Sequence, residues 1–255
     1  MADDPTGFIP VVKEVGKGGS KDFPHNVYLR RDKPGGRQLI VEARGGEMHQ
    51  NATIVRHPLL QQSLTILRNV ESDTAAFRHH ATIVASFLLI EATRHLHVAP
   101  INITTPLAET TGEHIDDQLV IVPVLRAGLA LLPAAQTLLP DVPVGFLGLE
   151  RDEHTAVARE YYQKFPNGLS DYKAIILDPM LATGGSLEET IHAVTKRGCN
   201  QIVLVCVVAA PEGIERVMTT YPDAQLYTAA IDSHLDERKF IVPGLGDFGD
   251  RYFGT

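Results

Sequence analysis

A carboxylate and a glycine-rich turn follow directly after a short apolar run. Residues 174–177 lead into Asp178, and the turn then reads Pro179-Met180-Leu181-Ala182-Thr183-Gly184-Gly185-Ser186. Glycines let backbone amides approach a ligand closely, and a helix start adds unpaired N–H groups and a positive dipole end. This combination predicts a phosphate cradle. At the end of its strand, Asp178 could accept hydrogen bonds from vicinal hydroxyls such as those of a ribose.

The same turn also fits a purely structural interpretation. Ser186 and Glu189 match a capping box, S-x-x-E, in which the serine caps its own helix. Glu188 and Glu189 would place negative charge near a bound phosphate, so the phosphate site is favoured only if both side chains point away. The sequence allows both interpretations.

An arginine lies at the end of another apolar run. Arg126 follows the strand predicted at Leu119–Val124 and precedes Ala127-Gly128. A guanidinium at this position suits a diphosphate, because it donates in a fork that matches phosphate oxygens. The alternative is an arginine paired with an acid on the surface.

Two later segments have compositions that suit a lid and a binding loop. The run Glu150–Lys164 is rich in charge; such runs are usually solvated loops, although long loops at strand ends also act as lids that exclude water. Residues 244–254 contain four glycines. Their exposed backbone donors and acceptors suit the recognition of a small planar base, because a wrong base would leave buried polar groups unpaired.

The elements around these residues alternate between strand and helix. Apolar strands are predicted at Leu119–Val124, Val144–Leu149, Ala174–Leu177, Ile202–Val208 and Leu226–Ile231. Helices are predicted at Leu129–Leu139, Ser186–Arg197 and Glu212–Thr220. This pattern indicates an α/β fold whose parallel sheet is covered on both faces, with ligands beyond the carboxyl ends of the strands.

The part of the chain before these elements divides into two regions. Residues 1–52 hold 8 of the 21 glycines and lack helical periodicity, which predicts an irregular or partly extended N-terminal extension. The second region is the domain at residues 53–255. It begins with helices predicted after Pro58 and after Asp73, and residues 99–118 are expected to form a hairpin-like excursion.

Composition excludes several classes of protein. The chain has 255 residues and a formal net charge of −8, which counts against nucleic-acid and anionic-membrane partners. Cys199 and Cys206 cannot form a disulfide framework and are expected to be reduced thiols. The longest apolar run, Ile202–Ala210, is far shorter than the ~20 residues of a membrane helix. The acidic start lacks the features of a signal peptide, so a cytoplasmic protein is expected.

Several of these segments resemble one enzyme family. Asp178–Ser186 resembles the phosphoribosyl-pyrophosphate (PRPP) motif of type I phosphoribosyltransferases, and more narrowly the form in uracil phosphoribosyltransferases, which typically have a proline where Pro179 stands. Val122–Leu129 resembles the pyrophosphate-binding turn of that family, and Ile241–Thr255 resembles its uracil-binding segment. Ala209–Gly213 and Tyr227–Asp232 also fit the pattern, so the resemblance covers about residues 53–255.

The resemblance implies a type I phosphoribosyltransferase-like sheet with a hood loop and a C-terminal base-binding segment. The implied reaction is uracil + PRPP → UMP + diphosphate, with Arg126, Arg151, Asp178 and Asp247 as catalytic residues. The implied PRPP-binding residues are Arg126, Arg151, Asp178, Pro179, Met180, Leu181, Ala182, Thr183, Gly184, Gly185, Ser186 and Asp247. The implied uracil-binding residues are Ile241, Gly246, Asp247 and Phe248, although many bacterial members have alanine where Phe248 stands.

Partners and alternatives follow from the same residues. No dedicated carboxylate cluster is apparent for a metal, so Mg²⁺ is expected to arrive with PRPP. GTP is kept as a candidate effector. The apolar helix at residues 77–90 and the excursion at 99–118 suggest the interface of a homodimer or homotetramer. The alternatives are a phosphoribosyltransferase for another nucleobase, such as hypoxanthine or orotate, and a regulator that senses PRPP or a nucleotide.

Overall fold

One twisted sheet carries the segments that the sequence singles out. The computed structural model describes residues 8–10, 26–30, 37–42, 48–151 and 158–255. The strands of the main sheet run in the order β1-β2-β3-β4-β13-β12-β10-β7-β8-β9, with the short β11 pairing beside β12. Their bounds are β1 Phe8–Pro10, β2 Asn26–Arg30, β3 Arg37–Glu42, β4 Met48–Ile54, β7 Gln118–Leu125, β8 Phe146–Arg151, β9 Ala158–Lys164, β10 Tyr172–Leu177, β11 Met180–Leu181, β12 Gln201–Ala209 and β13 Gln225–Ile231.

The middle of this sheet is parallel, as the sequence predicts. In sheet order, the neighbouring strands β4, β13, β12, β10, β7 and β8 pair in parallel. Strands β1 to β3 on one side and β9 on the other add antiparallel edges. In the register of the three central strands, Leu177 of β10 pairs with Pro123 of β7 and with Val205 of β12. The carboxyl ends of these strands therefore open onto the same edge of the sheet.

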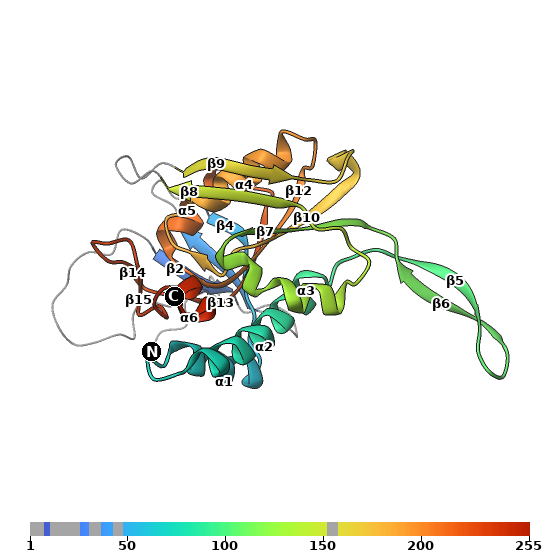
Figure 1. Cartoon of the computed structure of the whole chain (residues 1–255), viewed down its shortest axis with the longest axis horizontal. Helices are drawn as coiled ribbons and strands as arrows, with labels where there is room; N and C mark the ends of the chain where they lie inside the picture. Colours follow the sequence, from blue (N-terminus) through green and yellow to red (C-terminus); the bar gives the residue numbers. More distant parts are fainter. Residues whose placement is uncertain (1–7, 11–25, 31–36, 43–47, 152–157) are drawn as a thin grey trace.

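Helices cover both faces of the sheet, so its central strands are apolar throughout rather than alternating. The helices α1 (Pro58–Arg68), α2 (Thr74–Ala92) and α3 (Leu132–Leu138) pack on one face, and α4 (Gly185–Thr195) and α5 (Pro211–Thr220) pack on the other (Figure 1). Successive residues of a strand enter opposite cores: Leu177 contributes to the α2 side and Ile176 to the α4 side.

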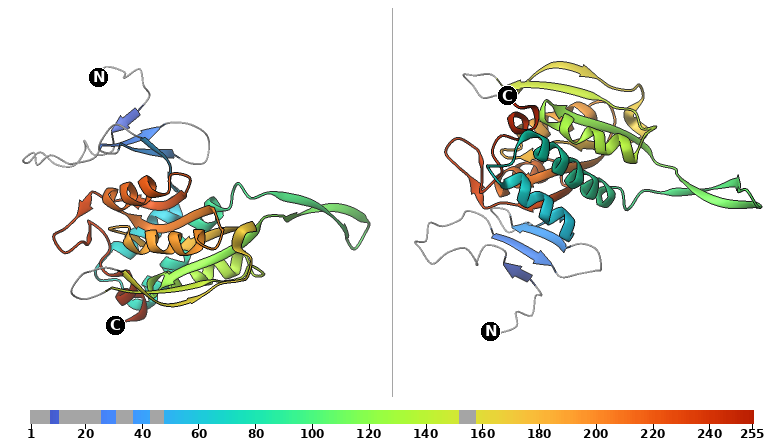
Figure 2. Two further views of the ribbon diagram at one scale, coloured as in Figure 1. Left: turned by 90° about the horizontal axis from the view of Figure 1, so that it is seen from above. Right: turned by 60° about the horizontal axis from the view of Figure 1, so that its bottom comes forward.

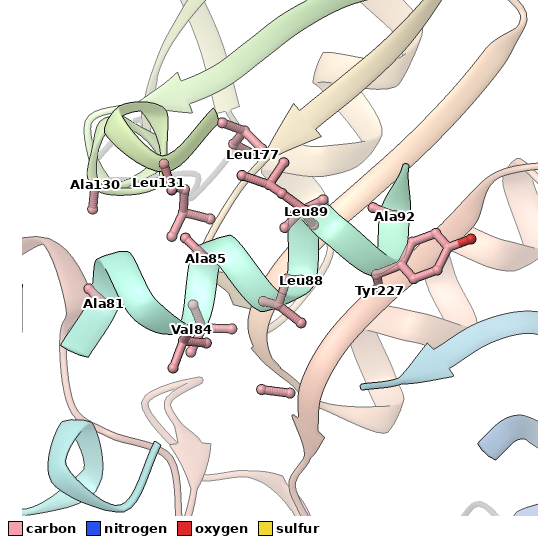
Figure 3. Close-up of a cluster of buried hydrophobic side chains, with 14 of the residues drawn as sticks. Ala81, Val84, Ala85, Leu88, Leu89, Ala92, Ala130, Leu131, Leu177 and Tyr227 are labelled. Carbon is pink, nitrogen blue, oxygen red and sulfur yellow. The ribbon is translucent and has the colours of Figure 1, made fainter. Parts of the chain in front are cut away.

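Helix α2 provides the centre of the first core. Asp73 caps its first turn by accepting a hydrogen bond of 2.7 Å from the Ala76 N–H, at the position the sequence predicts. Figure 3 shows Ala85 and Leu89 of α2 beside Leu131 and Leu177, and all four side chains are fully buried. The small alanines let α2 approach the sheet closely, which holds the end of β10 in place.

Two segments differ from the sequence prediction near the site. The helix predicted at Leu129–Leu139 is divided into a 3₁₀ turn, η2 (Ala127–Ala130), and α3, with Pro133 in the first turn of α3. Proline is favoured there because its missing N–H has no helical partner to lose. The polar stretch expected as a lid contains β9, paired with β8 at the edge of the sheet, where a polar strand is tolerated.

The extension at residues 1–52 contains regular strands where an irregular or partly extended chain was expected. β1, β2 and β3 form an antiparallel ribbon that continues to β4, and β4 pairs in parallel with β13 through Ala52 and Leu226. Strand β4 therefore crosses the boundary expected between residues 52 and 53. In the part of the chain that the structure describes, no helix is long and apolar enough to cross a bilayer.

The excursion predicted at residues 99–118 is a long two-stranded arm. Its strands are β5 (Val98–Thr104) and β6 (Glu109–Ile115), paired antiparallel along their whole length. Figures 1 and 2 show this arm extending away from the body of the molecule. The Asp117 carboxylate fastens its base by accepting from the backbone N–H of His97 at 2.8 Å and from Lys173 Nζ at 3.1 Å.

The turn after β7 packs directly on the end of β10, which gives a testable prediction. A Cβ atom at Gly128 would lie 2.3 Å from the carbonyl oxygen of Leu177, closer than any real contact. We expect Gly128→Ala to lower the free energy of unfolding by about 1–3 kcal/mol, because the backbone must move apart. Urea denaturation measures this. Gly112→Ala on the arm is the control, since its Cβ would lie 3.4 Å from Ile103 Cδ1; an equal loss in both variants would contradict the prediction.

Candidate active site

Asp178 is the buried charge at the centre of the candidate site. It follows β10 directly, is 8% exposed, and its backbone N–H donates to the carbonyl of Val205 at 3.2 Å. The Met180 N–H reaches its carboxylate at 3.4 Å. Burial raises the pKa of Asp178 from 3.8 to about 7, and the hydrogen bond from Met180 opposes that shift. A carboxylate at this strand end therefore gains from any ligand that donates hydrogen bonds to it.

The first part of the turn after Asp178 is fixed to the sheet. The Pro179 carbonyl accepts from the Val207 N–H at 2.9 Å and from the Val208 N–H at 3.1 Å, and the Leu181 carbonyl accepts from the Ala210 N–H at 2.8 Å. Residues Met180–Leu181 pair in parallel with β12 as β11. The carbonyls of these predicted PRPP residues are therefore bound to the sheet, which fixes the position of the backbone amides that follow them.

The second part of the turn opens a helix N-terminus. Gly184 has φ of 81° and is the N-cap residue of α4, with no side chain capping the helix. The capping-box interpretation of Ser186 and Glu189 is therefore wrong: the left-handed glycine starts the helix one residue earlier, and Ser186 lies inside it. The Ser186 carbonyl accepts from Thr190 Oγ1 at 2.7 Å. The first-turn amides of α4 remain available for an anion.

The two acidic residues after this turn, Glu188 and Glu189, point in different directions. Glu188 turns toward α5, where it accepts from Arg216 Nε at 2.7 Å and from the Thr220 hydroxyl at 3.1 Å. Glu189 is exposed and lines a pocket with His192 and Lys196, further along α4. Arg216 Nη1 stands 3.5 Å from where a Cβ of Gly185 would be, so the nearest cation lies beside the turn. Since Glu188 is paired with Arg216, its charge does not count against the phosphate interpretation, which stays a prediction.

Arg126 stands at the neighbouring strand end. Its side chain is 67% exposed and its Nη2 lies 3.9 Å from Asp250 Oδ1, which is itself exposed. A surface pair of this kind contributes roughly 0–1 kcal/mol, so the guanidinium can exchange its acid for a ligand at little cost. Both sequence interpretations of Arg126 are therefore compatible with its position.

The C-terminal segment meets the same edge through a short helix. Asp247 caps α6 (Phe248–Phe253) by accepting from the Asp250 N–H at 2.9 Å, and a Cβ at Gly249 would lie 3.9 Å from that of Ala127. The Phe248 ring lies in the core, 5.0 Å from the ring of Phe77, and Ile241 is also buried. Phe248 can therefore offer a base only its main chain.

One implied residue lies on the hood, in the hairpin of β8 and β9. Residue Arg151 ends β8, and its backbone pairs with that of Ala158. The Arg151 side chain and the hood residues 152–157 lie outside the part of the chain that the structure describes. The role of Arg151 stays a prediction.

The sequence did not predict the residues whose side chains bind the backbone around the C-terminal segment. Arg68 and Asp232 pair across the molecule, and Arg251 reaches three backbone carbonyls. Arg216 was missed as well. Asp232 and Arg251 lie inside segments that resemble the family, but nothing in their spacing indicates a partner, and Arg68 lies at a helix end without any motif.

Comparisons with known proteins agree with this geometry. A sequence model of the family described as uracil phosphoribosyltransferase matches residues 54–255. A uracil phosphoribosyltransferase of Campylobacter concisus is 41% identical over 206 residues, which is 81% of this chain and 99% of that protein. Another from Exiguobacterium sibiricum is 44% identical over 200 residues, covering 78% and 96%.

A solved structure shares the fold. The AQ2163 protein from Aquifex aeolicus superposes with a TM-score of 0.76 at 30% sequence identity, covering 80% of this chain and 98% of that one.

The buried carboxyl of Asp178 makes the stability of the free protein depend on pH. Below about pH 4 both folded and unfolded states bind its proton; as pH rises toward 7, only the unfolded state releases it freely, so stability falls. We expect Asp178→Asn, which cannot ionise, to raise Tm at pH 8 by about 4 °C or more and to leave it unchanged at pH 4.

Calorimetry of the ligand-free protein measures this difference. Asp223→Asn, at an exposed aspartate, is the matched control and should leave Tm the same at both pH values. An Asp178→Asn protein that melts at or below the wild-type Tm at pH 8 would contradict the expectation.

Proposed function

The chain belongs to the uracil phosphoribosyltransferase family, and from that premise we propose how its own residues carry out the reaction. The chain is a pentosyltransferase with the α/β fold of type I phosphoribosyltransferases. Its reaction is uracil + PRPP → UMP + diphosphate. The observation that carries the proposal is the buried carboxyl of Asp178 at the start of a turn that ends at the N-terminus of α4, which no side chain caps.

The sugar-phosphate end of PRPP occupies the turn after β10. The amides and hydroxyls of Thr183, Gly185 and Ser186 hold the 5′-phosphate, and Gly184 permits the turn that aims them. The ribose hydroxyls donate to Asp178. Two such hydrogen bonds favour the carboxylate over the carboxylic acid, so binding should lower the pKa of Asp178 from about 7.

The reaction moves charge from the ribose to the leaving group. The bond from the anomeric carbon to the diphosphate oxygen breaks first, the electron pair stays with the diphosphate, and the ribose gains oxocarbenium character. Arg126 and Arg151 stabilise the growing negative charge. Uracil nitrogen then attacks the opposite face of the sugar, its lone pair forms the new bond to the anomeric carbon, and its proton passes to solvent water. Holding both substrates in contact supplies much of the acceleration.

The remaining predicted residues orient the two substrates. The carboxylate of Asp247 lies near the reacting sugar, while the main chain of Ile241, Gly246, Asp247 and Phe248 reads the edge of the base. No thiol takes part as a nucleophile: burial raises the pKa of the Cys206 thiol well above its usual value, and Asp178 adds to the shift.

Magnesium enters this scheme as part of the donor substrate. Among the described residues, no group of three or more His, Cys, Asp or Glu side chains could hold a metal ion. Oxygen atoms of a diphosphate are ligands that Mg²⁺ prefers, so an ion bound to PRPP would supply positive charge beside the leaving group. GTP is a candidate effector, and a titration of GTP into the UMP assay tests it.

The arm gives the assembly its interface. Its strands expose Ile101 and Ile103, and Leu107 at the turn is 97% exposed. A monomer seldom leaves a row of large apolar side chains in water, so the arm packs against a second copy in a homodimer or homotetramer.

The reaction itself is tested by product formation. We expect labelled uracil and PRPP to give UMP in the presence of Mg²⁺ and none in excess EDTA. Cytosine, hypoxanthine and orotate should be turned over at least ~10²-fold less efficiently, since each leaves backbone donors or acceptors unpaired. Preference for one of these bases, or PRPP binding without turnover, would overturn the assignment.

A variant of Arg126 tests whether its guanidinium stabilises the transition state. Arg126→Ala should lower kcat by roughly tenfold or more with little change in Tm, because its guanidinium is exposed in the free protein. Unchanged kinetics would remove Arg126 from the site.

The interface is tested by mass in solution. The wild-type protein should run as a multiple of 27.9 kDa in size-exclusion chromatography with light scattering. Replacing Ile101, Ile103 and Leu107 by lysine should shift it to the monomer mass. Val70→Lys is the control, since Val70 is 90% exposed on the loop after α1. If the triple-lysine variant keeps the wild-type mass, the arm is not the interface of the oligomer.

A further inference from the structure

A bidentate ion pair lies behind the C-terminal loop, outside the residues to which the family resemblance assigns roles. Arg68 is the last residue of α1, and Asp232 follows β13. Arg68 Nη1 lies 2.8 Å from Asp232 Oδ2, and Arg68 Nη2 lies 2.7 Å from Asp232 Oδ1. Asp232 is 8% exposed, so the two groups hold a fixed geometry that water does not loosen.

Both members of this pair also bind the backbone of Gly244. The Gly244 N–H donates to Asp232 Oδ2 at 2.9 Å, and the Gly244 carbonyl accepts from Arg68 Nη1 at 2.7 Å. Gly244 has φ of 59°, and a Cβ there would lie 2.1 Å from the Ile241 carbonyl oxygen. Glycine is therefore required, and both of its polar groups are fixed by one ion pair.

Arg251 does the same for the next carbonyl. Its Nη1 donates to the Leu245 carbonyl at 2.7 Å, its Nη2 donates to the Asn69 carbonyl at 2.6 Å, and it also contacts the Leu67 carbonyl. The guanidinium stands over the Phe77 ring at 4.5 Å. Two successive carbonyls of the loop are thus turned toward α1.

The direction of these carbonyls fixes the direction of the amides. In a trans peptide the C=O and the N–H point to opposite sides, and the only cis bonds among the described residues are Leu125–Arg126 and Val242–Pro243. The N–H groups of Leu245 and Gly246 therefore point away from the two arginines. A loop held in this way presents hydrogen-bond donors on its other side.

We propose that the Arg68–Asp232 pair is a positioning device for base selection. By holding Gly244 it aims the Leu245 amide at a carbonyl oxygen of the base, beside the Gly246 amide that Arg251 orients through the Leu245 carbonyl. Uracil has an oxygen at the ring position where cytosine carries an amino group, and a second donor facing these amides would be rejected. This inference rests on the proposed function, since it concerns the base site of that reaction.

Kinetics of variants separate positioning from general stability. Arg68→Met and Asp232→Asn should raise KM for uracil by roughly tenfold or more, change KM for PRPP by less than about twofold, and narrow the preference for uracil over cytosine. Arg68→Lys keeps the charge but not the fork, so its KM for uracil should lie between those of wild type and Arg68→Met. If Arg68→Met fails to fold, the KM for uracil of Arg68→Lys still tests the inference.

The matched control is an arginine that holds the other end of α6. Arg78 Nε donates to the Tyr252 carbonyl at 2.7 Å, and its Nη2 lies 3.4 Å from that of Phe253. Arg78→Met should lower Tm and leave KM for uracil unchanged. An equal rise of KM for both substrates in the Arg68 variants, or the same rise in Arg78→Met, would overturn the inference.

The wild-type protein separates the two levels of failure. If it makes UMP while the Arg68 and Asp232 variants keep their KM for uracil, the positioning role is wrong and the proposed function stands. If it makes no UMP, both fall together.

Discussion

The burial of the Asp178 carboxyl group, which has no ion-pair partner among the described residues, is the constraint on which the candidate site depends. Asp178 lies at the end of a strand that is apolar on both faces, and within the described residues its carboxylate accepts just one long hydrogen bond, from the Met180 N–H. An ionised group in such a place costs free energy, which shows as a pKa of about 7. The free protein thus carries a cost that a ligand donating hydrogen bonds to Asp178 would relieve.

The segments around Asp178 lie close to it because their backbones pack directly against one another. Gly128 lets the turn after β7 touch the end of β10, and Gly213 lets α5 approach the turn at Ala182, where a Cβ would lie 2.3 Å from the carbonyl oxygen. A side chain at either position would push the neighbouring backbone away. The glycines are required by packing first, and the ligand site follows from the packing.

Local patterns could predict the sheet and the contacts within one turn, but not contacts between distant segments. The apolar runs around Ile121, Ile175 and Leu204 placed the central strands, because strands covered on both faces leave a continuous signal. Asp178 and the turn to Ser186 were found since strand, acid, glycine and helix are adjacent in sequence. The start of α4 at Gly185 was missed because a left-handed glycine competes with a capping serine. Arg68 and Asp232 lie 164 residues apart, and no local pattern joins them.

The strand that crosses the expected domain boundary has a consequence for how the chain can be shortened. The family match begins at residue 54, yet β4 runs from Met48 to Ile54 and covers the outer edge of β13. A chain trimmed to the family match would keep the candidate site and lose this cover. It would expose a row of unpaired amides and carbonyls beside Leu226, a template for chain-to-chain pairing. Strand β4 therefore covers an edge of the sheet that a chain limited to the family match would leave open.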